Sequence, residues 1–375
     1  MKIGIMTINS AYNYGCVLQA WSLQRFLEKE GHEAEIINYR IPEIDNVYRL
    51  FQKRNKYGNG VLNACYNGVR RLKFRLTQGP RIRKAAKFEH FIGGVMNTTR
   101  VFGSFRQLKE ERAGDAYDVL ITGSDQVWNG TITKGMKPAY FLAFDGTGKK
   151  KLAYAASIGK RELMNAEKDF FRRYLREYSS IGVREKSAKR LLAPLTDRPV
   201  SVVLDPTLLL EREDFDRLKK PSRFRKPYIL VHLIGRDPRV AKIVVPVSEQ
   251  TGLPVVQNRL KRLYVNELGR FADAGPEEFL GLVEGAELVI TNSFHATVFS
   301  IVYRKNFITI PHELYPERME NLLQEAGLER HLISSPEELP ESAAELMPDY
   351  AEVWKRLAIR QEESRNYLRR ALGEN

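Results

Sequence analysis

The sequence predicts an α/β fold with parallel sheets, divided into two domains. Apolar, strand-like runs alternate with helical segments along the chain, and this alternation breaks once and then restarts. Crossovers of about a dozen or more residues join the runs, as parallel strands require. The chain has 375 residues, of which 43% are hydrophobic, and this is enough for two domains of ordinary size.

The first half of the chain begins with a βαβ unit. A strand is expected at 3–8, a helix at 17–30 after a polar turn, and a second strand at 34–39 after Gly31. Beyond a basic insertion, the alternation predicts strands at 118–122, 152–156, 181–183 and 200–204, with helices at 166–178 and 186–192. We therefore place an N-terminal domain at 1–215, with the insertion at about 41–110.

The charged stretch 211–226, together with Pro221 and Pro227, indicates a domain boundary. The pattern then restarts, with strands expected at 228–233, 254–257, 288–291 and 306–310, and helices at 240–251, 276–284 and 319–326. The last segment, 349–372, is one long charged helix whose position suggests that it packs back across the domains. We place the C-terminal domain at 222–348 and the C-terminal helix at 349–375.

A basic segment at 49–90 contributes strongly to the net charge of +14. Its one acid is Glu89, and its basic residues are Arg49, Lys53, Arg54, Lys56, Arg70, Arg71, Lys73, Arg75, Arg81, Arg83, Lys84 and Lys87. Interleaved apolar residues make the segment amphipathic, as in helices that lie on anionic membrane surfaces. A solvated insertion with a half-buried helix explains the pattern equally well. Nucleic acid is not expected as a partner, because no nucleic-acid-binding motif accompanies the charge.

Membrane-spanning and targeting segments are not expected from the sequence. It contains no run of about 18 apolar residues, and it enters a strand-like run directly instead of beginning with a signal peptide. These features predict a cytoplasmic protein. Cys16 and Cys65 lack a Cys-x-x-Cys spacing, so neither a disulfide framework nor a zinc cluster is suggested, and both should be reduced and structural.

His295 is the candidate site residue that most needs explanation. It follows the predicted strand 288–291 and precedes a helix, at the strand end where open α/β sheets bind ligands and helix N-termini attract anions. A lone histidine in an apolar stretch is more often a satisfied core residue. The polar neighbours Thr291, Ser293 and Thr297 make a ligand site an equal alternative.

Polar residues also follow two strands of the first half. Asn13 and Gly15 lie at the first strand-to-helix turn, where glycine permits close backbone approach and the helix can receive an anion. Ser124 and Asp125 follow the strand 118–122 and favour a site, although a turn or helix cap would use the same residues. The G-x-G-x-x-G fingerprint of dinucleotide binding is absent.

Charged residues follow the last two strands of that half. Arg184, after 181–183, could hold a carboxylate or phosphate through its fork of donors, and a surface ion pair is an equal alternative. Asp205, after 200–204, is a candidate acid, although a helix or turn cap is its more common role.

Several motifs stand along the chain in a fixed order. They are Asn-Tyr-Gly-Cys-Val-Leu-Gln-Ala at 13–20, Gly-Ser-Asp-Gln-Val-Trp-Asn at 123–129, Tyr-Ala-Ala-Ser-Ile-Gly at 154–159, Val-Arg-Glu-Lys at 183–186, Val-Leu-Asp-Pro-Thr-Leu-Leu at 203–209, and Thr-Asn-Ser-Phe-His at 291–295. In this order they resemble the polysaccharide pyruvyl transferase family, over nearly the whole chain. The resemblance implies the GT-B architecture of two Rossmann-like domains with parallel sheets, with the ligand in the interdomain cleft and the C-terminal helix returning to the first domain.

The resemblance also implies an activity, namely transfer of pyruvate from phosphoenolpyruvate to two hydroxyls of a sugar in a cell-surface glycan precursor. The product would be a cyclic ketal, and no nucleotide or redox cofactor would be needed. By motif position, Arg184 would hold an anionic group of the donor, His295 would bind its phosphate or act as the acid, and Asp125 would orient or deprotonate the hydroxyl. The further donor-binding candidates are Asn13, Gly15, Ser124, Lys186, Ser293 and Arg318, and no metal ligand is assigned.

One departure from the family pattern concerns Ser293. Many members carry arginine two residues before the histidine, whereas a Ser-Phe-His version resembles a subgroup. Such a chain would recruit another cation, such as Arg318 or Lys186, or use a different donor. Acceptors in this family are commonly attached to a lipid carrier, which would give the segment 49–90 a purpose at the inner membrane face.

Two alternative functions stay open at the level of sequence. A GT-B scaffold does not determine its chemistry, so a glycosyltransferase that uses a sugar nucleotide is the first. The second is a catalytically silent homologue that binds a glycan or a membrane. In that case Ser293 would replace the family's arginine because the protein no longer reacts with the donor.

Overall fold

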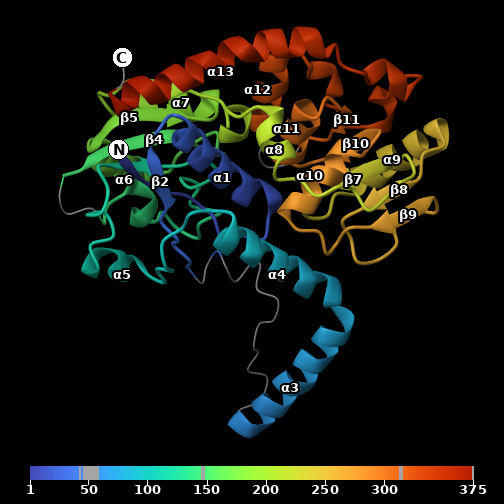
Figure 1. The fold of residues 1–375 in the computed structure, drawn as a ribbon, viewed down its shortest axis with the longest axis horizontal. Coiled ribbons are helices and arrows are strands. Elements are labelled where there is room, and N and C mark those ends of the chain that lie inside the picture. The colour runs from blue at the N-terminus through green and yellow to red at the C-terminus, as the bar shows by residue number, and fades with distance from the viewer. Residues whose placement is uncertain (42–43, 45–58, 145–147, 312–315, 374–375) are drawn as a thin grey trace.

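Two parallel sheets form the frame of the protein (Figure 1). The computed structural model describes residues 1–41, 44, 59–144, 148–311 and 316–373. The first sheet has the strand order β2-β1-β3-β4-β5-β6, and the second has the order β11-β10-β7-β8-β9. All neighbouring strands in these orders pair in parallel. The predicted α/β fold with two parallel sheets is therefore confirmed.

The strands lie close to the predicted apolar runs. The first sheet consists of β1 (Lys2–Met6), β2 (Glu33–Ile36), β3 (Val119–Thr122), β4 (Lys150–Ala156), β5 (Tyr178–Val183) and β6 (Val200–Val202). The second consists of β7 (Ile229–His232), β8 (Val255–Gln257), β9 (Glu267–Arg270), β10 (Leu288–Thr291) and β11 (Asn306–Thr309). β3 and β10 are buried along their whole length, as expected for parallel strands covered on both faces.

The helices connect these strands and cover the sheets. Those of the first half are α1 (Tyr14–Lys29), α3 (Gly60–Thr77), α4 (Gly79–Gly94), α5 (Phe105–Glu110), α6 (Asn165–Leu175), α7 (Lys186–Leu192) and α8 (Arg212–Asp216). They are followed by α9 (Pro238–Thr251), α10 (Pro276–Glu284), α11 (Phe294–Val302), α12 (Glu317–Ala326) and α13 (Tyr350–Leu372). α1 begins at Tyr14 and not at residue 17, because the Asn13 side chain caps it by accepting from the Gly15 amide at 2.9 Å.

β9 and α8 are among the elements that were not predicted. β9 is an edge strand with the sequence Glu-Leu-Gly-Arg, which lacks the apolar run that indicates a strand. α8 lies inside the charged stretch 211–226. The many charged residues there gave no indication that Phe215 would be buried. Phe215 is fully buried and packs against Trp21 and Phe299, so this stretch is held against the core.

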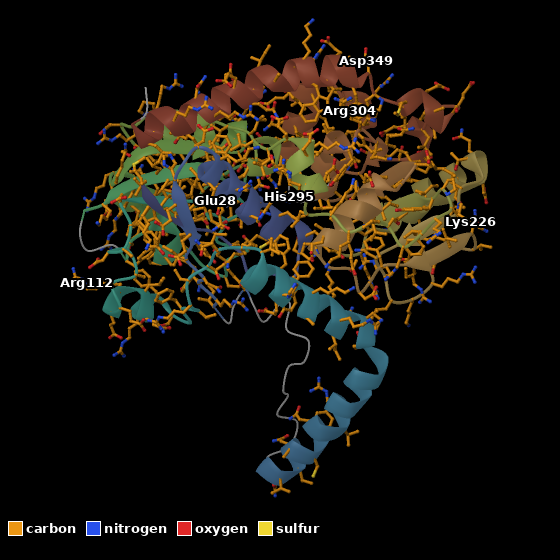
Figure 2. The ribbon with its side chains drawn as sticks, in the orientation of Figure 1. Glu28, Arg112, Lys226, His295, Arg304 and Asp349 are labelled. Atoms are coloured by element: carbon orange, nitrogen blue, oxygen red, sulfur yellow. The ribbon has the colours of Figure 1, made fainter. Side chains whose placement is uncertain are left out.

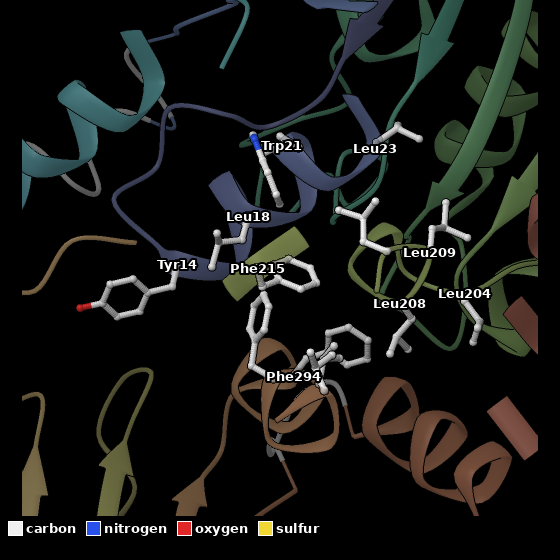
Figure 3. Close-up of a cluster of buried hydrophobic side chains, with 14 of the residues drawn as sticks. Tyr14, Leu18, Trp21, Leu23, Leu204, Leu208, Leu209, Phe215 and Phe294 are labelled. Atoms are coloured by element: carbon white, nitrogen blue, oxygen red, sulfur yellow. The ribbon is translucent and has the colours of Figure 1, made fainter. Parts of the chain in front are cut away.

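One apolar core passes from the first half of the molecule to the second. It joins side chains of β1, β3, β4 and α1 to side chains of α10, α11, α12 and α13. Figure 3 shows part of it, where Leu18 and Trp21 on α1 lie near Phe215 and Phe294. Two further clusters cover the opposite faces of the sheets. The two halves therefore share buried apolar surface, which stabilises their association.

The C-terminal helix α13 runs across both halves, as predicted (Figure 1). At its start, the Tyr350 hydroxyl donates to the carbonyls of Ser300 at 3.2 Å and Lys305 at 2.5 Å, both in the second half. Near its end, the Tyr367 hydroxyl donates to the carbonyl of Ala153 on β4 at 2.9 Å. Hydrogen bonds near both ends therefore fasten this helix to each half of the molecule.

The basic insertion contributes two helices of different character. Residues 49–58 of the basic segment lie outside the described residues. α3 projects away from the body of the protein (Figure 1) and carries the exposed residues Val61, Leu62 and Val69. α4 packs on the body through the buried rings of Phe88 and Phe91. The predicted amphipathic segment is thus divided into a projecting arm and a docked helix.

Both cysteines are free thiols. Cys16 is buried and donates a hydrogen bond to the Ile8 carbonyl, as a structural residue would. Cys65 is exposed on α3, so the expectation that it is structural is wrong, because this helix projects from the body. None of the helices that the structure describes is long and apolar enough to cross a membrane.

Removing one hydroxyl should test the fastening of α13. Tyr367→Phe leaves the buried ring in place and deletes its hydrogen bond to Ala153, so the free energy of unfolding should fall by about 1 kcal/mol. Chemical denaturation followed by circular dichroism measures this change. Tyr174→Phe is the matched control, because its half-buried ring packs on Phe141 and no hydrogen bond of its hydroxyl is found among the described residues. Equal stability of Tyr367→Phe and the wild type would contradict the fastening role.

Candidate functional site

Four polar side chains meet at the carboxyl ends of β3, β5 and β6. Arg184 Nη1 donates to Asp205 Oδ2 at 2.7 Å, and Ser124 Oγ donates to the same oxygen at 3.2 Å. Asp125 Oδ1 lies 3.7 Å from Arg184 Nη2. The side chains of Arg184 and Asp205 are 3% and 0% exposed, so they form a buried ion pair. Parallel strands bring these residues together because their carboxyl ends share one edge of the sheet.

Asp205 is surrounded by hydrogen-bond donors. Its Oδ1 accepts from the Thr207 amide at 3.1 Å and from the Thr207 hydroxyl at 2.7 Å, which caps the turn Pro206–Leu208. Burial alone would raise the pKa of this carboxyl, but His295, Arg184 and Thr207 outweigh burial and hold the pKa well below its usual range. Asp205 is therefore an anion at neutral pH, and it is both the turn cap and the partner of Arg184.

Asp125 has an unusual backbone conformation. Its φ is +72°, in the left-handed region that residues other than glycine rarely adopt. A parallel bridge to Ala156 holds it there, and the amide of Ser157 donates to its carbonyl at 3.0 Å. This conformation is fixed by β4, and it keeps the Asp125 carboxylate near Arg184 while leaving that side chain 19% exposed. Asp125 is thus able to meet a molecule that approaches from solvent.

His295 lies at the N-terminus of α11, in the middle of the molecule (Figure 2). The Ser293 hydroxyl caps this helix by accepting from the Ala296 amide at 3.4 Å. The helix N-terminus and the cap hold the imidazole near the buried ion pair, with Nε2 at 3.5 Å from Asp205 Oδ2. His295 from the second sheet therefore joins Arg184 and Asp205 from the first.

Gly15 allows the two halves to meet at His295. A Cβ at Gly15 would overlap the imidazole of His295, contacting Nδ1, Cγ and Cε1. The hydrogen bond between Asn13 Oδ1 and the Gly15 amide holds the start of α1 in this position. The predicted close backbone approach at Gly15 therefore exists, and the group that it admits is the candidate histidine.

Arg318 on α12 adds a second guanidinium to the site. Its Cζ lies 5.7 Å from the ring centroid of Phe294, and that of Arg184 lies 4.8 Å from the same centroid. Burial and the charge of Arg184 lower the pKa of Arg318 to about 10, so it stays protonated at neutral pH. Burial would lower the pKa of Arg184, but Asp205 and Asp125 raise it. Two cations thus share one aromatic ring.

Several nitrogen atoms at this point are buried without a hydrogen-bond partner among the described residues. They are Nε and Nη2 of Arg184, Nε2 of His295 and Nε of Arg318. Buried donors of this kind carry a free-energy cost unless a ligand or water satisfies them. Because three of the four belong to guanidinium groups, the arrangement is suited to an anion with several oxygen atoms.

Glu185 holds the loop after β4 next to Arg184 through hydrogen bonds. Its Oε1 accepts hydrogen bonds from the Ile158 amide at 2.8 Å, the Gly159 amide at 3.0 Å and the Ser157 hydroxyl at 3.1 Å. These bonds tie the loop after β4 to the end of β5, next to Arg184. The sequence reasoning did not single out Glu185, although its place between Arg184 and Lys186 was visible.

Not all of the sequence-predicted residues converge on the site. Lys186 is exposed, and its Nζ donates to Gln324 Oε1 on α12 at 3.1 Å. Asn13 and Ser293 serve as helix caps, so their side chains position α1 and α11. Phe294 was not predicted as a site residue. An aromatic residue next to a histidine in the sequence does not indicate that two arginines will lie over its ring.

Solved structures show similarity to this chain at the level of the fold. Solved structures similar to this chain include the MnaA-UDP co-structure from S. aureus (TM-score 0.51, 12% identity, 99% of this chain and 96% of that chain). They also include the UDP-GlcNAc 2-epimerase from Methanocaldococcus jannaschii (TM-score 0.48, 16% identity, 98% and 94%) and the calicheamicin glycosyltransferase CalG4 (TM-score 0.43, 14% identity, 99% and 96%). The first likeness supports the expected GT-B-like fold. No curated protein sequence matches the chain.

A comparison with protein-family models gives a match over most of the chain. The matching description is polysaccharide pyruvyl transferase, and the matched residues are 13–313 of 375. This range includes the motifs that bring Gly15, Asp125, Arg184, Asp205 and His295 together. The chain therefore belongs to the polysaccharide pyruvyl transferase family.

Proposed function

We propose that this transferase moves pyruvate from phosphoenolpyruvate onto two hydroxyls of a sugar in a glycan precursor, forming a cyclic ketal. The observation that carries this proposal is the pair of buried guanidiniums, Arg184 and Arg318, with unpartnered nitrogens beside His295. Phosphoenolpyruvate has a carboxylate and a phosphate, and separate cations suit two separate anionic groups. No nucleotide or redox cofactor takes part in the proposed reaction.

The proposed reaction has two steps. In the first, a sugar hydroxyl adds to C2 of phosphoenolpyruvate. The methylene carbon of phosphoenolpyruvate takes up a proton and becomes the methyl group. In the second, the other hydroxyl displaces inorganic phosphate from C2 and closes the ketal ring. Each hydroxyl loses one proton. One of these two protons is equivalent to the proton that the methylene carbon takes up, and the other leaves with phosphate or passes to solvent.

His295 is our candidate for the acid, and Asp125 for the group that orients or deprotonates the hydroxyl. The Asp205 carboxylate, with Oδ2 at 3.5 Å from His295 Nε2, orients the imidazole. Asp125 has the more exposed carboxylate of the two acids near Arg184, so it is accessible to an acceptor sugar. Acid and base roles thus fall on residues from different sheets.

Arg318 is proposed to supply the positive charge that Ser293 lacks. Ser293 caps α11 and lies in the position where many family members have arginine, whereas Arg318 reaches the ring of the adjacent Phe294 from α12. Lys186 fits this role less well, because its ammonium group is bonded to Gln324 at the surface. The donor therefore stays phosphoenolpyruvate in this proposal.

We further propose that the protein works at the inner face of the membrane, through α3. This arm carries exposed Val61, Leu62 and Val69 together with basic residues, and it projects from the body (Figure 1). Apolar residues that insert between headgroups and cations that face anionic lipid favour such attachment. Binding there would bring the enzyme to a lipid-linked glycan acceptor.

Substitution of either buried arginine should weaken donor binding. Arg184→Gln and Arg318→Gln each remove a charged donor from the proposed site, so the dissociation constant for phosphoenolpyruvate should rise by about tenfold or more. Titration calorimetry measures it, with thermal unfolding as the check on folding. Arg190→Gln is the control, because Arg190 is exposed and pairs with Glu317 at 3.2 Å on the surface.

Two results of that titration would contradict the proposal. One is wild-type affinity for phosphoenolpyruvate in both variants, which would remove the arginines from the donor site. The other is tight binding of a sugar nucleotide by a wild-type protein that does not bind phosphoenolpyruvate, with or without acceptor. That result would indicate a glycosyltransferase.

Gly15→Ala should separate activity from folding. The added methyl group overlaps the His295 imidazole and displaces it, so turnover should fall by about a hundredfold or more. The control is Gly93→Ala on α4, where an added Cβ meets no atom within 4 Å. In a double-mutant cycle, Gly15→Ala should add little to the loss caused by His295→Ala. Independent, additive losses would show that Gly15 does not act through His295.

Membrane attachment should depend on the apolar residues of α3. The triple change Val61→Ser, Leu62→Ser and Val69→Ser should weaken binding to vesicles that contain anionic phospholipid by about tenfold or more. Vesicle sedimentation measures binding, and zwitterionic vesicles should bind weakly in all cases. Val245→Ser with Val265→Ser is the control, because these valines are exposed on the second half. Equal losses in the control and the triple variant would exclude a specific role for α3.

A further inference from the structure

The cations of α4 fall into two groups. Arg83 and Lys87 face carboxylates of the second half, with Arg83 Nε at 3.4 Å from Asp273 Oδ2 and Lys87 Nζ at 2.6 Å from Glu278 Oε2. Arg81 and Lys84, one helical turn apart, have no carboxylate within 4.0 Å among the residues that the structure describes. The first group docks the helix. The second adds positive charge at the same junction that no carboxylate of the described residues pairs with.

Two arginines of the second half also lack a carboxylate partner among the described residues. Arg236 follows β7 and Arg259 follows β8, so both stand at the carboxyl ends of neighbouring strands. The guanidinium of Arg259 donates to the Gly235 carbonyl, and Asn258 joins the two loops through its bonds with Leu233 at 3.2 and 2.9 Å. Within the described part of the chain, neither arginine has a carboxylate within ion-pair distance.

Lys84 and the loop that carries Arg236 lie at one junction, because Lys84 lies over the Tyr14 ring, which packs on His232 at the end of β7. Burial and then Arg81 lower the pKa of Lys84 to about 8. Burial lowers the pKa of Arg259, and the charges of Arg236 and Arg81 lower it further. Like charges at such positions repel, and a low-dielectric environment strengthens the repulsion. An anion that binds between these cations would replace their mutual repulsion with attraction.

The cluster adjoins the site that contains His295. Lys84 Nζ lies 4.3 Å from the ring centroid of Tyr14, and the Tyr14 ring packs on the His232 ring with centroids 5.4 Å apart. His232 ends β7, and burial, Lys84 and Arg259 lower its pKa to about 3, so it is neutral and adds no charge. Gly15, the next residue after Tyr14, touches His295. Both sites therefore share the first turn of α1.

We propose that Arg81, Lys84, Arg236 and Arg259 bind the diphosphate of the acceptor, carried as a polyprenyl diphosphate or a nucleoside diphosphate. The inference rests on the proposed function, in which Arg184 and Arg318 already hold the donor. Two adjacent phosphates supply oxygen atoms and charge for several cations from opposite sides. A sugar attached to this diphosphate extends past Tyr14 toward His295, where its hydroxyls meet the donor.

Inorganic pyrophosphate tests the cluster directly. Its dissociation constant, measured by titration calorimetry on the full chain, should rise by about tenfold or more in Lys84→Met and in Arg259→Gln. Lys87→Met is the matched control on the same helix, because Lys87 already pairs with Glu278. Affinity for phosphoenolpyruvate should change by less than about twofold in these variants, whereas Arg184→Gln should show the opposite pattern.

The outcomes distinguish this inference from the proposed function. Unchanged pyrophosphate affinity in both folded variants would overturn the diphosphate site, and so would an equal loss of phosphoenolpyruvate affinity, which would assign the cluster to the donor. A wild-type protein that binds pyrophosphate through the cluster but never binds phosphoenolpyruvate would contradict the proposed function alone. Displacement of pyrophosphate by farnesyl diphosphate in micelles or by UDP identifies the carrier, and displacement by neither would overturn the proposal.

Discussion

The contact between Gly15 and His295 is the constraint on which the rest of the site depends. It brings the N-terminus of α1 against the N-terminus of α11, so the positive ends of two helix dipoles meet at one place. Packing of α1 on the second half makes this contact possible, and the absence of a side chain at Gly15 makes room for the imidazole. The anion Asp205 then lies close to these helix ends, with Oδ2 at 3.5 Å from His295 Nε2.

Within the described residues, the hydrogen-bond donors of the site are only partly satisfied by the protein itself. Asp205 accepts hydrogen bonds from Thr207, Ser124 and Arg184, which leaves it fully occupied, while nitrogens of Arg184 and Arg318 have no partner among the described residues. Removing Asp205 would leave the buried guanidinium of Arg184 without its closest carboxylate, so Asp205 holds Arg184 in place. The unsatisfied guanidinium nitrogens are the groups that an anionic donor would bind.

The sequence predicted the frame better than it predicted the contacts. Apolar runs and crossover lengths located β10, α7 and α10 with their observed bounds, because periodicity and length are local properties. They also placed Arg184 and Asp205 at strand ends. Local patterns could not show that Arg318 would approach Arg184 from another domain, or that Lys186 would face outward, because both depend on how the sheets are oriented. β9 was missed for a related reason, since its pairing with β8 is not encoded in an apolar run.

The apolar core that crosses from one half to the other restricts how this protein moves. Swinging the sheets apart as rigid bodies would expose side chains such as Leu18, Phe279 and Phe299 to water and would break the bonds that α13 makes at both ends. Each large side chain exposed in this way costs about 1.5–3 kcal/mol, so a hinge of this kind is strongly disfavoured. Substrate entry and product release are therefore expected to occur on a preassembled frame, without separation of the two halves.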